Sequence, residues 1–571
     1  MQELWERLKL HRAVGWELAG ASVLINFLAL TSSLYSTQVM NRYLSLGVDA
    51  TLVALTLGAM LALVFEVVLR HARSALAQWT CARADRQLGE AALAATAHSQ
   101  YAAFESMPAP ARREALSGLT TIQQSYGAGS LTALLDAPAA LLFIVCLFVL
   151  NTLLGVLTVL TIAAVVGASW ITNRLQQAPG ADQSRHALQL AATQHTLAAS
   201  PELVRSFKAH EPLRNAWRAV GVDLHQARSL LAGVQSLSSN ASYAAGILLG
   251  MLVMGLGARE VFAGRLDVGT LIGANILAGR ALAAVTRLTQ LTDGLARGRR
   301  ALDALGQLAR LPRERSEGTT LARYTGALRL EDVAFSWPRQ STPLFEHLDF
   351  DLHSGGVVAV TGANGTGKTT LAKMLAGLLE PSRGRMLADG MDLRQALPEW
   401  WRGQVAWLPQ EPQFFDGSLR ENLAVLQPGI ADGELLDLCR ELGLADFVEG
   451  SPDGLQMQVR GGGGAIPPGI RRRLALVRAL AGGGSLVVLD EPTEGLDAAG
   501  CRAVATLLNR LVREGRTIVA MSNEPFIVAA AQATIDLNVK PVPRIVLAAN
   551  AARPAPSAAV TPLRPDTAVA V

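Results

Sequence analysis

The sequence predicts a two-part chain: an all-α domain that spans a membrane, followed by an α/β domain. Half of the 571 residues are hydrophobic and only 17% are charged, a composition that is unusual for a soluble protein of this length. Apolar runs long enough to cross a bilayer fill the first part of the chain. Short apolar runs separated by glycine-rich turns fill the second part, and the length itself predicts more than one domain.

Six apolar runs define the membrane domain. They lie at about residues 16–39, 52–69, 131–150, 153–171, 243–258 and 268–285. Each approaches the roughly 20 residues that a helix needs to cross a hydrocarbon core of roughly 30 Å. Only Asn151 and Thr152 separate the third run from the fourth, which predicts a tight hairpin on the far side of the membrane. The sixth run is the weakest, because it contains Asn275 and Arg280.

Basic residues predict the orientation of these spans. Two long polar stretches with a helical pattern, at about 70–130 and 173–242, are rich in arginine, whereas the short loops on the other side hold few. The positive-inside rule therefore predicts that both stretches and the N-terminus are cytoplasmic. The net charge of +4 is small for this length and gives no reason to expect nucleic acid as a partner. The four cysteines have no metal-binding or redox spacing, which argues against a secreted, disulfide-bonded protein.

Changes in composition predict the domain boundaries. We expect the membrane domain over residues 1–310 and a charged linker over 311–325. Strand-like runs and glycine-rich turns mark the second domain at 326–547. The last segment, 548–571, is rich in alanine and proline, which predicts a disordered tail.

A glycine-rich loop in the second domain predicts an ATP site. Val357–Val360 is apolar enough for a buried strand, and Leu371–Leu375 has a helical pattern. The residues between them are Gly362, Ala363, Asn364, Gly365, Thr366, Gly367, Lys368, Thr369 and Thr370. This strand–loop–helix order is that of a P-loop, whose backbone amides surround phosphates. Lys368 is expected to reach the β- and γ-phosphates, and the Thr369 hydroxyl to ligate Mg²⁺.

A second apolar strand, Ser485–Leu489, ends in two acidic residues. Asp490 would orient Mg²⁺ through its water shell, and Glu491 is then positioned to activate the attacking water as a general base. Strands often end in carboxylates, so either residue alone is weak support. Together with the P-loop, the pair predicts a magnesium-dependent ATPase.

The second domain resembles, throughout residues 326–547, the nucleotide-binding domain of ATP-binding cassette (ABC) transporters. Trp337 matches the aromatic residue that stacks on adenine in that family. Gln410 matches the glutamine that contacts Mg²⁺ and senses the membrane domain. Asp497 ends a segment, Pro492–Asp497, that matches the turn crossing to the partner cassette. The resemblance implies a half-transporter that works as a homodimer or as a heterodimer with another half-transporter.

Two motifs depart from the family pattern. The family signature Leu-Ser-Gly-Gly-Gln aligns here with Ile466, Pro467, Pro468, Gly469 and Ile470. In the family, the signature hydroxyl and amides hold the γ-phosphate of the ATP on the opposite cassette, and proline has no amide N–H. We therefore expect a weakened phosphate contact on an intact fold.

The family's switch histidine falls at Asn523, which can donate a hydrogen bond but cannot carry a positive charge, so slower hydrolysis is expected.

The membrane domain resembles the type-1 exporter domain of type I secretion ABC exporters. The matching segments are Leu34–Tyr43 at the end of the first span, Leu135–Pro138 at the start of the third, and Leu266–Ile272 with Ile276–Leu282 in the sixth. No peptidase-like domain precedes the first span, which favours the protease-exporter layout. The resemblance implies a multi-pass protein of the bacterial inner membrane with a cytoplasmic ATP-binding domain. It also implies a periplasmic adaptor and an outer-membrane channel as partners.

The sequence thus predicts an ATPase and translocase that exports a polypeptide, with hydrolysis impaired in a homodimer. Three alternatives stay open: a heterodimer whose partner supplies an intact signature, an ATP-binding regulatory half with little turnover, and an exporter of lipids or small molecules. Ser200–Phe207, in the second cytoplasmic stretch, is either a coupling helix that docks on a cassette near Gln410 or an ordinary helix face. The sequence does not indicate the transported substrate.

Overall fold

The computed structural model of the chain describes residues 2–9, 12–44, 47, 49–199, 201–337 and 342–548. The tail predicted at 548–571 lies outside the described residues, except for Ala548. The chain divides into two compact units. One contains Met1–Ala97 and Met107–Leu311, and the other contains His98–Ser106 together with the chain from Pro312 onward.

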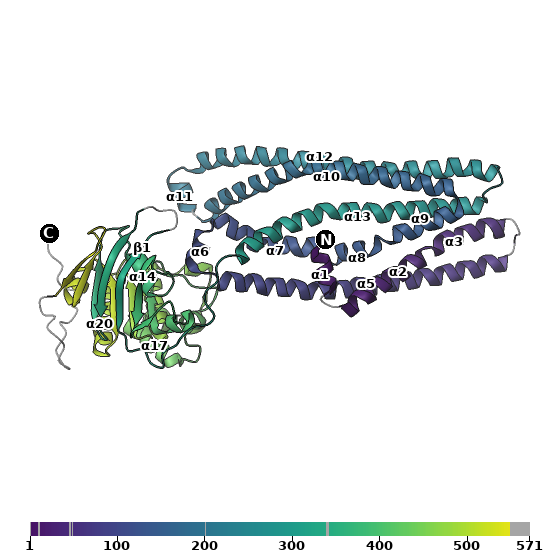
Figure 1. Ribbon diagram of the computed structural model, residues 1–571. Helices are drawn as coiled ribbons and strands as arrows, with labels where there is room; N and C mark the ends of the chain where they lie inside the picture. The colour runs from purple at the N-terminus through teal and green to yellow at the C-terminus, as the bar shows by residue number, and fades with distance from the viewer. Residues whose placement is uncertain are drawn as a thin grey trace. The chain divides into compact units, whose positions relative to one another are not determined.

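The described part of the first unit consists of helices joined by short connections (Figure 1). They are α1 (Gln2–Lys9), α2 (Arg12–Ala29), α3 (Thr31–Gln38), a π-helical turn (Val39–Tyr43), α5 (Asp49–Ala97), α7 (Ala109–Ser125), α8 (Ala128–Asp136), α9 (Ala139–Leu150), α10 (Thr152–Ala199), α11 (Pro201–Ser206), α12 (His210–Phe262) and α13 (Val268–Ala309). The segment Pro201–Ser206, where the sequence suggested a coupling helix, is thus a short helix of this unit. Its docking on a cassette stays a prediction.

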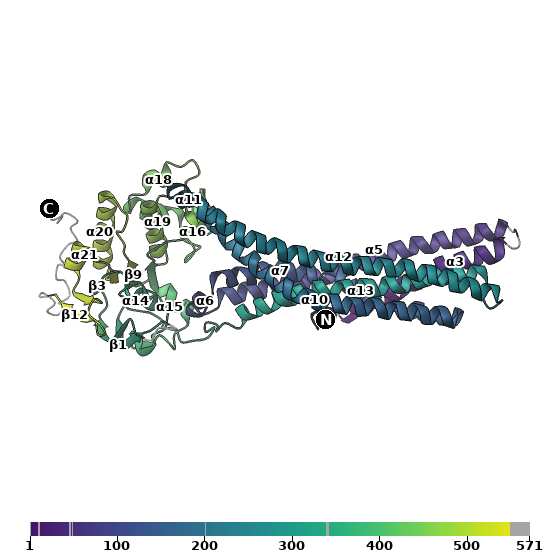
Figure 2. The same cartoon turned by 90° about the horizontal axis from the view of Figure 1, so that it is seen from above.

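Six helical segments among the described residues are long and apolar enough to cross a membrane, which confirms the predicted six-helix domain. Several extend far beyond the apolar runs, because a helix of 48 residues such as α10 is about 72 Å long at 1.5 Å per residue. The polar stretches therefore continue the spans as the same helices. Figures 1 and 2 both show α10 and α12 side by side along much of their length.

The hairpin between α9 and α10 turns at Asn151, as the sequence predicts. Asn151 is extended, with φ of −161°. Its side-chain oxygen accepts hydrogen bonds from the backbone amides of Leu153 (3.0 Å) and Leu154 (3.3 Å). The first amides of a helix have no partner within the helix, so Asn151 both ends α9 and caps α10.

Farther along, α10 contains Pro179. Proline has no amide N–H and cannot donate to the carbonyl four residues earlier, so the hydrogen-bond ladder of α10 has a gap at this position. Beside the gap, the Arg300 guanidinium of α13 donates to the carbonyl of Gly180 (3.3 Å). The carbonyl that loses its helical donor is that of Leu175, so the Arg300 contact lies close to the interruption but does not fill it.

A buried ion pair joins three helices of the membrane unit. Arg73 of α5 is only 6% exposed and pairs with the carboxylate of Asp136, the last residue of α8. Arg73 also donates to the hydroxyl of Ser22 in α2 (2.9 Å), and Asn26 donates to Asp136 (3.3 Å). Because an unpaired buried charge is strongly destabilising, these contacts tie α2, α5 and α8 together. The sequence motif at Leu135–Pro138 therefore contains a structural carboxylate.

The second unit is an α/β domain whose described residues form three sheets. Its strands are β1 (Leu328–Phe335), β2 (Phe345–Leu352), β3 (Val357–Thr361), β4 (Arg383–Ala388), β5 (Met391–Asp392), β6 (Val405–Leu408), β7 (Gly417–Ser418), β8 (Gln458–Val459), β9 (Leu486–Asp490), β10 (Thr517–Met521), β11 (Ala533–Asp536) and β12 (Arg544–Leu547). The main sheet has the order β12-β11-β3-β10-β9-β6, and a second sheet has the order β2-β1-β4-β5. Only β12 is antiparallel to its neighbour in the main sheet.

Helices cover the main sheet and form a separate helical region. They are α14 (Lys368–Leu375), α15 (Pro398–Gln404), α16 (Leu419–Leu423), α17 (Asp432–Glu441), α18 (Ala445–Glu449), α19 (Pro468–Ala481), α20 (Ala498–Arg513) and α21 (Pro525–Ala530). Every residue of β9 and of β10 is buried, as expected for parallel strands covered on both faces. One hydrophobic core surrounds Trp401 and α14, and another joins α16–α20 to the sheet. These features confirm the predicted α/β fold class.

A short segment between α5 and α7 belongs to the second unit rather than to the membrane unit. It is His98–Ser106, which includes α6 (Tyr101–Ser106). The backbone of Gln100 donates to the carbonyl of Pro312 (2.8 Å), and Lys373 of α14 donates to the hydroxyl of Tyr101 (3.0 Å). The sequence indicated a docking segment only in the second cytoplasmic stretch, whereas this segment lies in the first.

Candidate nucleotide site

Four neighbouring parallel strands bring the predicted site residues to one edge of the main sheet. In sheet order these strands are β3, β10, β9 and β6. The P-loop follows β3, and Asn523 follows β10. Asp490 ends β9 and Glu491 follows it, while Gln410 follows β6. The carboxyl ends of parallel strands lie at the same edge, where α/β proteins bind ligands. The fold thus gathers segments that lie far apart in the sequence.

The P-loop connects β3 to α14 and contains glycines whose φ angles lie in the left-handed region. Gly365 has φ of +83° and Gly367 has φ of +110°, conformations that residues with a Cβ atom rarely adopt. Gly367 is the cap of α14, which begins at Lys368. The first backbone amides of a helix lack intrahelical partners and carry the positive end of the helix dipole. The loop therefore presents amide donors where a phosphate group binds.

Lys368 links the P-loop to the end of β9. Its side chain is buried, and its ammonium group donates to the carbonyl of Gly362 (2.6 Å). The same group lies 3.0 Å from the Glu491 carboxylate. The cation that is predicted to reach the phosphates therefore contacts the predicted general base directly.

The Asp490 side chain is fully buried at the end of β9. Among the described residues, neither of its carboxylate oxygens has a partner at normal hydrogen-bond geometry, although the Thr369 hydroxyl lies close enough to affect its pKa. Burial raises the pKa of Asp490 above its usual value, and the nearby Thr369 hydroxyl opposes this rise. Thr369 in turn donates to the side-chain oxygen of Gln410 (3.4 Å). Hydroxyl, carboxylate and amide oxygens are the ligands that Mg²⁺ prefers, so these residues fit the cation.

Glu491 has a strained backbone, with φ of +49°. Such a conformation is uncommon outside glycine and costs roughly 1–3 kcal/mol, so it persists only where neighbouring contacts enforce it. The backbone amide of Glu491 donates to the carbonyl of Met521 in β10 (2.9 Å). Its carbonyl accepts from the Arg472 guanidinium of α19. These contacts fix the direction of the Glu491 side chain.

Arg472 connects three of the loops around the site. Besides Glu491, its guanidinium donates to the carbonyl of Gln410 (2.9 Å) and to the carboxylate of Glu494 (3.1 Å). The side chain is only 8% exposed. In the sequence, the run Arg471–Arg473 only aligns the signature and indicates no role for Arg472. No pattern in a single sequence could have indicated these long-range contacts.

The Asn523 side chain both accepts a hydrogen bond from the P-loop backbone and donates one to it. Its side-chain oxygen accepts from the amide of Gly362 (3.0 Å), and its side-chain nitrogen donates to the carbonyl of the same residue (2.9 Å). The sequence led us to expect a donor for phosphate at this position. In the structure one of the two amide hydrogens is used by Gly362, so Asn523 positions the start of the P-loop.

The degenerate signature occupies the start of α19. Pro467 is the cap residue, with φ of −51° and ψ of 138°, and Pro468 is the first helical residue. Both side chains are exposed, whereas Ile466 packs into the hydrophobic core. Proline is well tolerated at the first helical position, so the fold survives, but two amides at this helix terminus are missing. Within the described residues, Ile466–Gly469 make no hydrogen bond to the P-loop.

Two further predicted residues have structural contacts of their own. Trp337 packs edge-on against Phe335, with 5.2 Å between the ring centres, and is half-buried. Asp497 caps α20, because its carboxylate accepts from the backbone amide of Gly500 (2.7 Å). These contacts are compatible with the roles that the family resemblance implies, and those roles stay predictions.

A P-loop α/β domain on the same chain as six membrane helices defines a membrane transport ATPase. Residues 345–494 match the family model described as ABC transporter, and residues 18–282 match the model of the ABC transporter transmembrane region. The chain is an ABC exporter, with a transmembrane domain and an ATP-binding domain. It is a multi-pass protein of the inner membrane whose ATP-binding domain is cytoplasmic, and it binds ATP as an ATPase and translocase.

Relatives of known name cover most of the chain. The alpha-hemolysin translocation ATP-binding protein HlyB of Escherichia coli O157:H7 is 24% identical over 517 residues, which is 90% of this chain and 73% of that protein. The cyclolysin secretion/processing ATP-binding protein CyaB of Bordetella pertussis is 25% identical over 515 residues, which is 90% of this chain and 72% of that protein. A solved structure of a bacterial Atm1-family ABC exporter with ATP bound has a TM-score of 0.80 at 19% identity, covering 92% of this chain and 94% of that one. This last likeness supports the fold alone.

Proposed function

We propose that this ABC exporter moves a polypeptide outward across the inner membrane by type I secretion. The observation that carries the proposal is the extent of the likeness to HlyB and CyaB, which covers 90% of the chain and thus both domains. Those relatives are named for the translocation of hemolysin and the secretion of cyclolysin. The motifs at Leu34–Tyr43 and Leu135–Pro138 favour the same class of exporter. A periplasmic adaptor and an outer-membrane channel are the partners that such a pathway needs.

In the proposed cycle, ATP clamps two cassettes head to tail and the membrane helices change their arrangement. Lys368 and the P-loop amides hold the phosphates. Glu491, released from Lys368 when a phosphate takes that cation, accepts a proton from the attacking water. Trp337 would stack on adenine, and Asp497 would lie at the dimer interface. The strained backbone at Glu491 keeps the carboxylate aimed at the site throughout.

We assign Mg²⁺ to Thr369 and Gln410 directly and to Asp490 through water. The buried Asp490 carboxylate supports this assignment, because neither of its oxygens has a partner at normal hydrogen-bond geometry and a bound cation would stabilise the buried anion. When bound, the cation neutralises negative charge on the phosphates.

The proposed function is tested by comparing the proteins released by cells that carry the wild-type chain or the Lys368→Ala variant. We expect at least one polypeptide to disappear from the medium of the variant while membrane lipid composition stays unchanged. Glu514→Gln, at an exposed surface ion pair, serves as a control that leaves secretion intact. Unchanged medium proteins together with an altered lipid composition would instead indicate the lipid exporter and overturn the proposal.

A second candidate is that this chain is the ATP-binding half of a heterodimer with low turnover of its own. It is favoured by Pro467 and Pro468 at the start of α19, which remove two amides and a hydroxyl from the surface that holds the partner's γ-phosphate. Hydrogen bonds to charged groups contribute roughly 1.5–3 kcal/mol each, so a homodimer would lose several kcal/mol at both sites. A partner with an intact signature would restore one site.

Purification from the native membrane distinguishes the two arrangements. A homodimer predicts that the tagged chain is recovered alone and hydrolyses ATP. A heterodimer predicts that a second half-transporter co-purifies at equal amount, and that the chain alone binds ATP without appreciable hydrolysis. Recovery of the chain alone with robust ATPase activity contradicts the heterodimer.

A further inference from the structure

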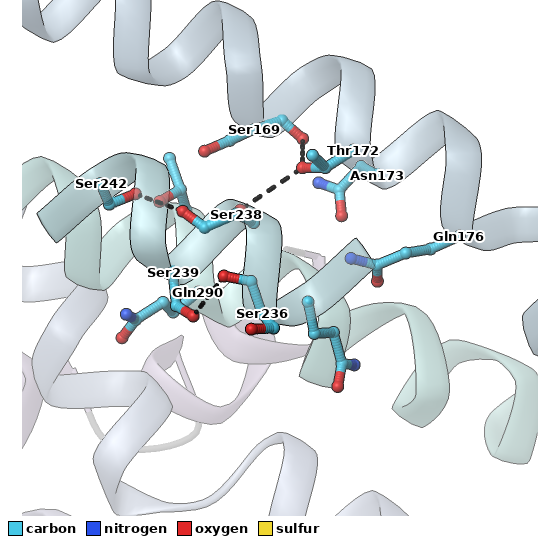
Figure 3. Close-up of a pocket in the computed structure, with 11 residues that line it drawn as sticks. Ser169, Thr172, Asn173, Gln176, Ser236, Ser238, Ser239, Ser242 and Gln290 are labelled. Carbon is cyan, nitrogen blue, oxygen red and sulfur yellow. Dashed lines mark hydrogen bonds between the residues drawn. The ribbon is translucent and has the colours of Figure 1, made fainter. Parts of the chain in front are cut away.

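A cavity of about 310 Å³ lies within the membrane unit, between α10, α12 and α13 (Figure 3). All eleven residues that line it are serine, threonine, asparagine or glutamine. Thr172 and Asn173 come from α10, Gln235 and Ser238 from α12, and Gln290 from α13. Figure 3 shows side chains of these three helices gathered around the same space. We call this cavity the neutral chamber.

The neutral chamber lies where the apolar parts of the three helices end. The predicted apolar runs cover about 153–171, 243–258 and 268–285, and the lining residues fall within 169–176, 235–242 and 289–290. These positions are the cytoplasmic ends of the runs, because the arginine-rich stretches lie on that side. Polar side chains at this depth face the interior of a bundle or a water-filled cavity, since lipid offers them no partner. The chamber therefore lies at the cytoplasmic end of the membrane domain.

Hydrogen bonding leaves the chamber with both acceptors and donors. The Thr172 hydroxyl donates to the carbonyl of Ser169 (3.0 Å), and the Ser242 hydroxyl donates to the carbonyl of Ser238 (3.0 Å). Hydroxyls that donate to their own helix keep oxygen lone pairs available. In the part of the chain that the structure describes, the side-chain amides of Gln235 and Gln290 are exposed at the mouth of the chamber and form no hydrogen bond within the protein, so both are accessible to a ligand. Each of these amides offers two N–H donors and one carbonyl acceptor.

The lining also limits what can bind. Its eleven residues include no lysine, arginine, histidine, aspartate, glutamate or cysteine, so it offers no counter-charge for an anionic headgroup and no strong metal ligand. Arg174, next to the lining residue Asn173, lies over the Trp170 ring instead, 4.4 Å from its centre. An acyl chain would exclude water from these polar groups and give them no partner, which is unfavourable. A neutral ligand with closely spaced donors and acceptors satisfies them.

We propose that the neutral chamber holds an extended, uncharged segment of the exported polypeptide by hydrogen bonds to its main chain. Amide N–H and C=O groups alternate along any polypeptide, so the chamber recognises this chemistry with little regard to side-chain sequence. The inference rests on the proposed function, because it specifies which chemical groups of a polypeptide cargo the membrane domain binds. Charged segments of the cargo are excluded from the chamber.

The test uses the full chain in lipid nanodiscs and a fluorescent, end-capped peptide of serine, glycine and asparagine. We expect saturable binding of this peptide, and no binding of the same peptide with methylated backbone nitrogens, which lacks the N–H donors. Gln290→Leu and Gln235→Leu should each weaken binding several-fold, up to about tenfold, because each removes hydrogen-bonding groups from the lining. Gln177→Leu makes the same chemical change at an exposed position of α10 outside the lining and should leave binding unchanged.

A second measurement, protection of a cysteine in the chamber from alkylation, does not require variants with weakened peptide binding. In Ser238→Cys, the peptide should slow labelling of the new thiol by a soluble alkylating reagent, as read at that residue by mass spectrometry. In Gln177→Cys, outside the lining, the peptide should not change the labelling rate. Equal labelling with and without the peptide in Ser238→Cys overturns the assignment of the chamber.

The outcomes separate this inference from the proposed function. Saturable peptide binding that is unaffected by Gln235→Leu and Gln290→Leu, with no protection at position 238, overturns the chamber and leaves polypeptide export in place. Absence of saturable binding, or equal binding of the methylated peptide, also overturns the chamber. The proposed function fails independently, when the Lys368→Ala variant leaves the secreted proteins unchanged.

Discussion

The ammonium group of Lys368 lies 3.0 Å from the carboxylate of Glu491, so the predicted phosphate ligand and the predicted general base form an ion pair. Both side chains are largely shielded from solvent. Binding of a phosphate group to Lys368 competes with this pair. The same event that engages ATP therefore frees the base that acts on it.

Glu491→Gln is expected to reduce ATP hydrolysis by about 100-fold or more, because general-base catalysis is lost. ATP binding should be retained or become tighter, since Lys368 no longer has to leave a carboxylate. ATPase rates and nucleotide titrations of the purified full chain measure both effects. Glu449→Gln, at an exposed ion pair with Arg440, is the matched control. Hydrolysis by Glu491→Gln at the wild-type rate would contradict the assigned role.

Asp490→Asn is expected to raise the melting temperature of the nucleotide-free chain at neutral pH. Burial raises the pKa of Asp490 above 3.8, so the folded state holds this proton more tightly than the unfolded state does. Stability therefore falls as pH rises from 3.8 through the raised pKa, and the ionised residue is destabilising above it. The gain from the substitution should shrink in mildly acidic buffer. The variant should at the same time lose magnesium-dependent hydrolysis.

Thermal scans of wild type and Asp490→Asn at several pH values, without nucleotide, measure this effect. Asp437→Asn is a suitable control, because Asp437 is exposed and pairs only at the surface. A melting temperature of Asp490→Asn below that of the wild type at neutral pH would mean that the carboxylate stabilises the fold, against the expectation.

Pro467→Ser combined with Pro468→Gly is expected to increase ATP hydrolysis by the chain alone. The two changes restore a hydroxyl and two amides at the start of α19. Each restored hydrogen bond to a phosphate contributes roughly 1.5–3 kcal/mol, which is about tenfold or more in the stability of the ATP-bound dimer. Steady-state ATPase rates at several protein concentrations measure the expected increase in hydrolysis. Pro525→Ser, at the start of α21, controls for proline removal at a helix start. An unchanged rate would show that the prolines do not limit the site.

Arg472→Met is expected to lower kcat more than it raises KM for ATP. The guanidinium positions the backbones of Gln410 and Glu491 and the side chain of Glu494, and none of these contacts involves the P-loop. The loss should therefore affect the catalytic step more than binding. Arg473→Met is the control, because Arg473 donates to the carbonyls of Leu442, Gly443 and Gly469 and to none of the groups that Arg472 contacts. Equal changes in both variants would indicate a general loss of stability.

Local patterns predicted the parts of the site that are contiguous in the chain. The P-loop was recognisable because its glycines, Lys368 and Thr369 lie between a strand and a helix, and Asp490 because it ends an apolar strand. Gln410 and Asn523 came from family resemblance, and the structure explains their convergence by the order of strands β3, β10, β9 and β6. The fold class was predictable because the two halves differ strongly in hydropathy and in how often glycine-rich turns interrupt their apolar runs.

Long-range contacts could not be predicted in this way. Arg472 acts through carbonyl groups that any residue carries, so no residue type indicates its partners. Tyr101 lies in a polar stretch whose pattern does not distinguish a segment of the cassette unit from a membrane-domain helix. The neutral chamber combines three helices whose serines and glutamines are unremarkable in sequence until the packing brings Thr172, Ser238 and Gln290 around one space.

Pro179 gives α10 a point of weakness within one turn of Gln176, a lining residue of the neutral chamber. A helix bends most easily where one of its backbone hydrogen bonds is missing, and proline is a common cause of such bends. Bending there would change the width of the chamber while the apolar portion of α10, nearer Asn151, stays straight in the bilayer. A bend at Pro179 would act as a hinge beside the neutral chamber, and it would let the chamber release a bound segment without the span leaving its neighbours.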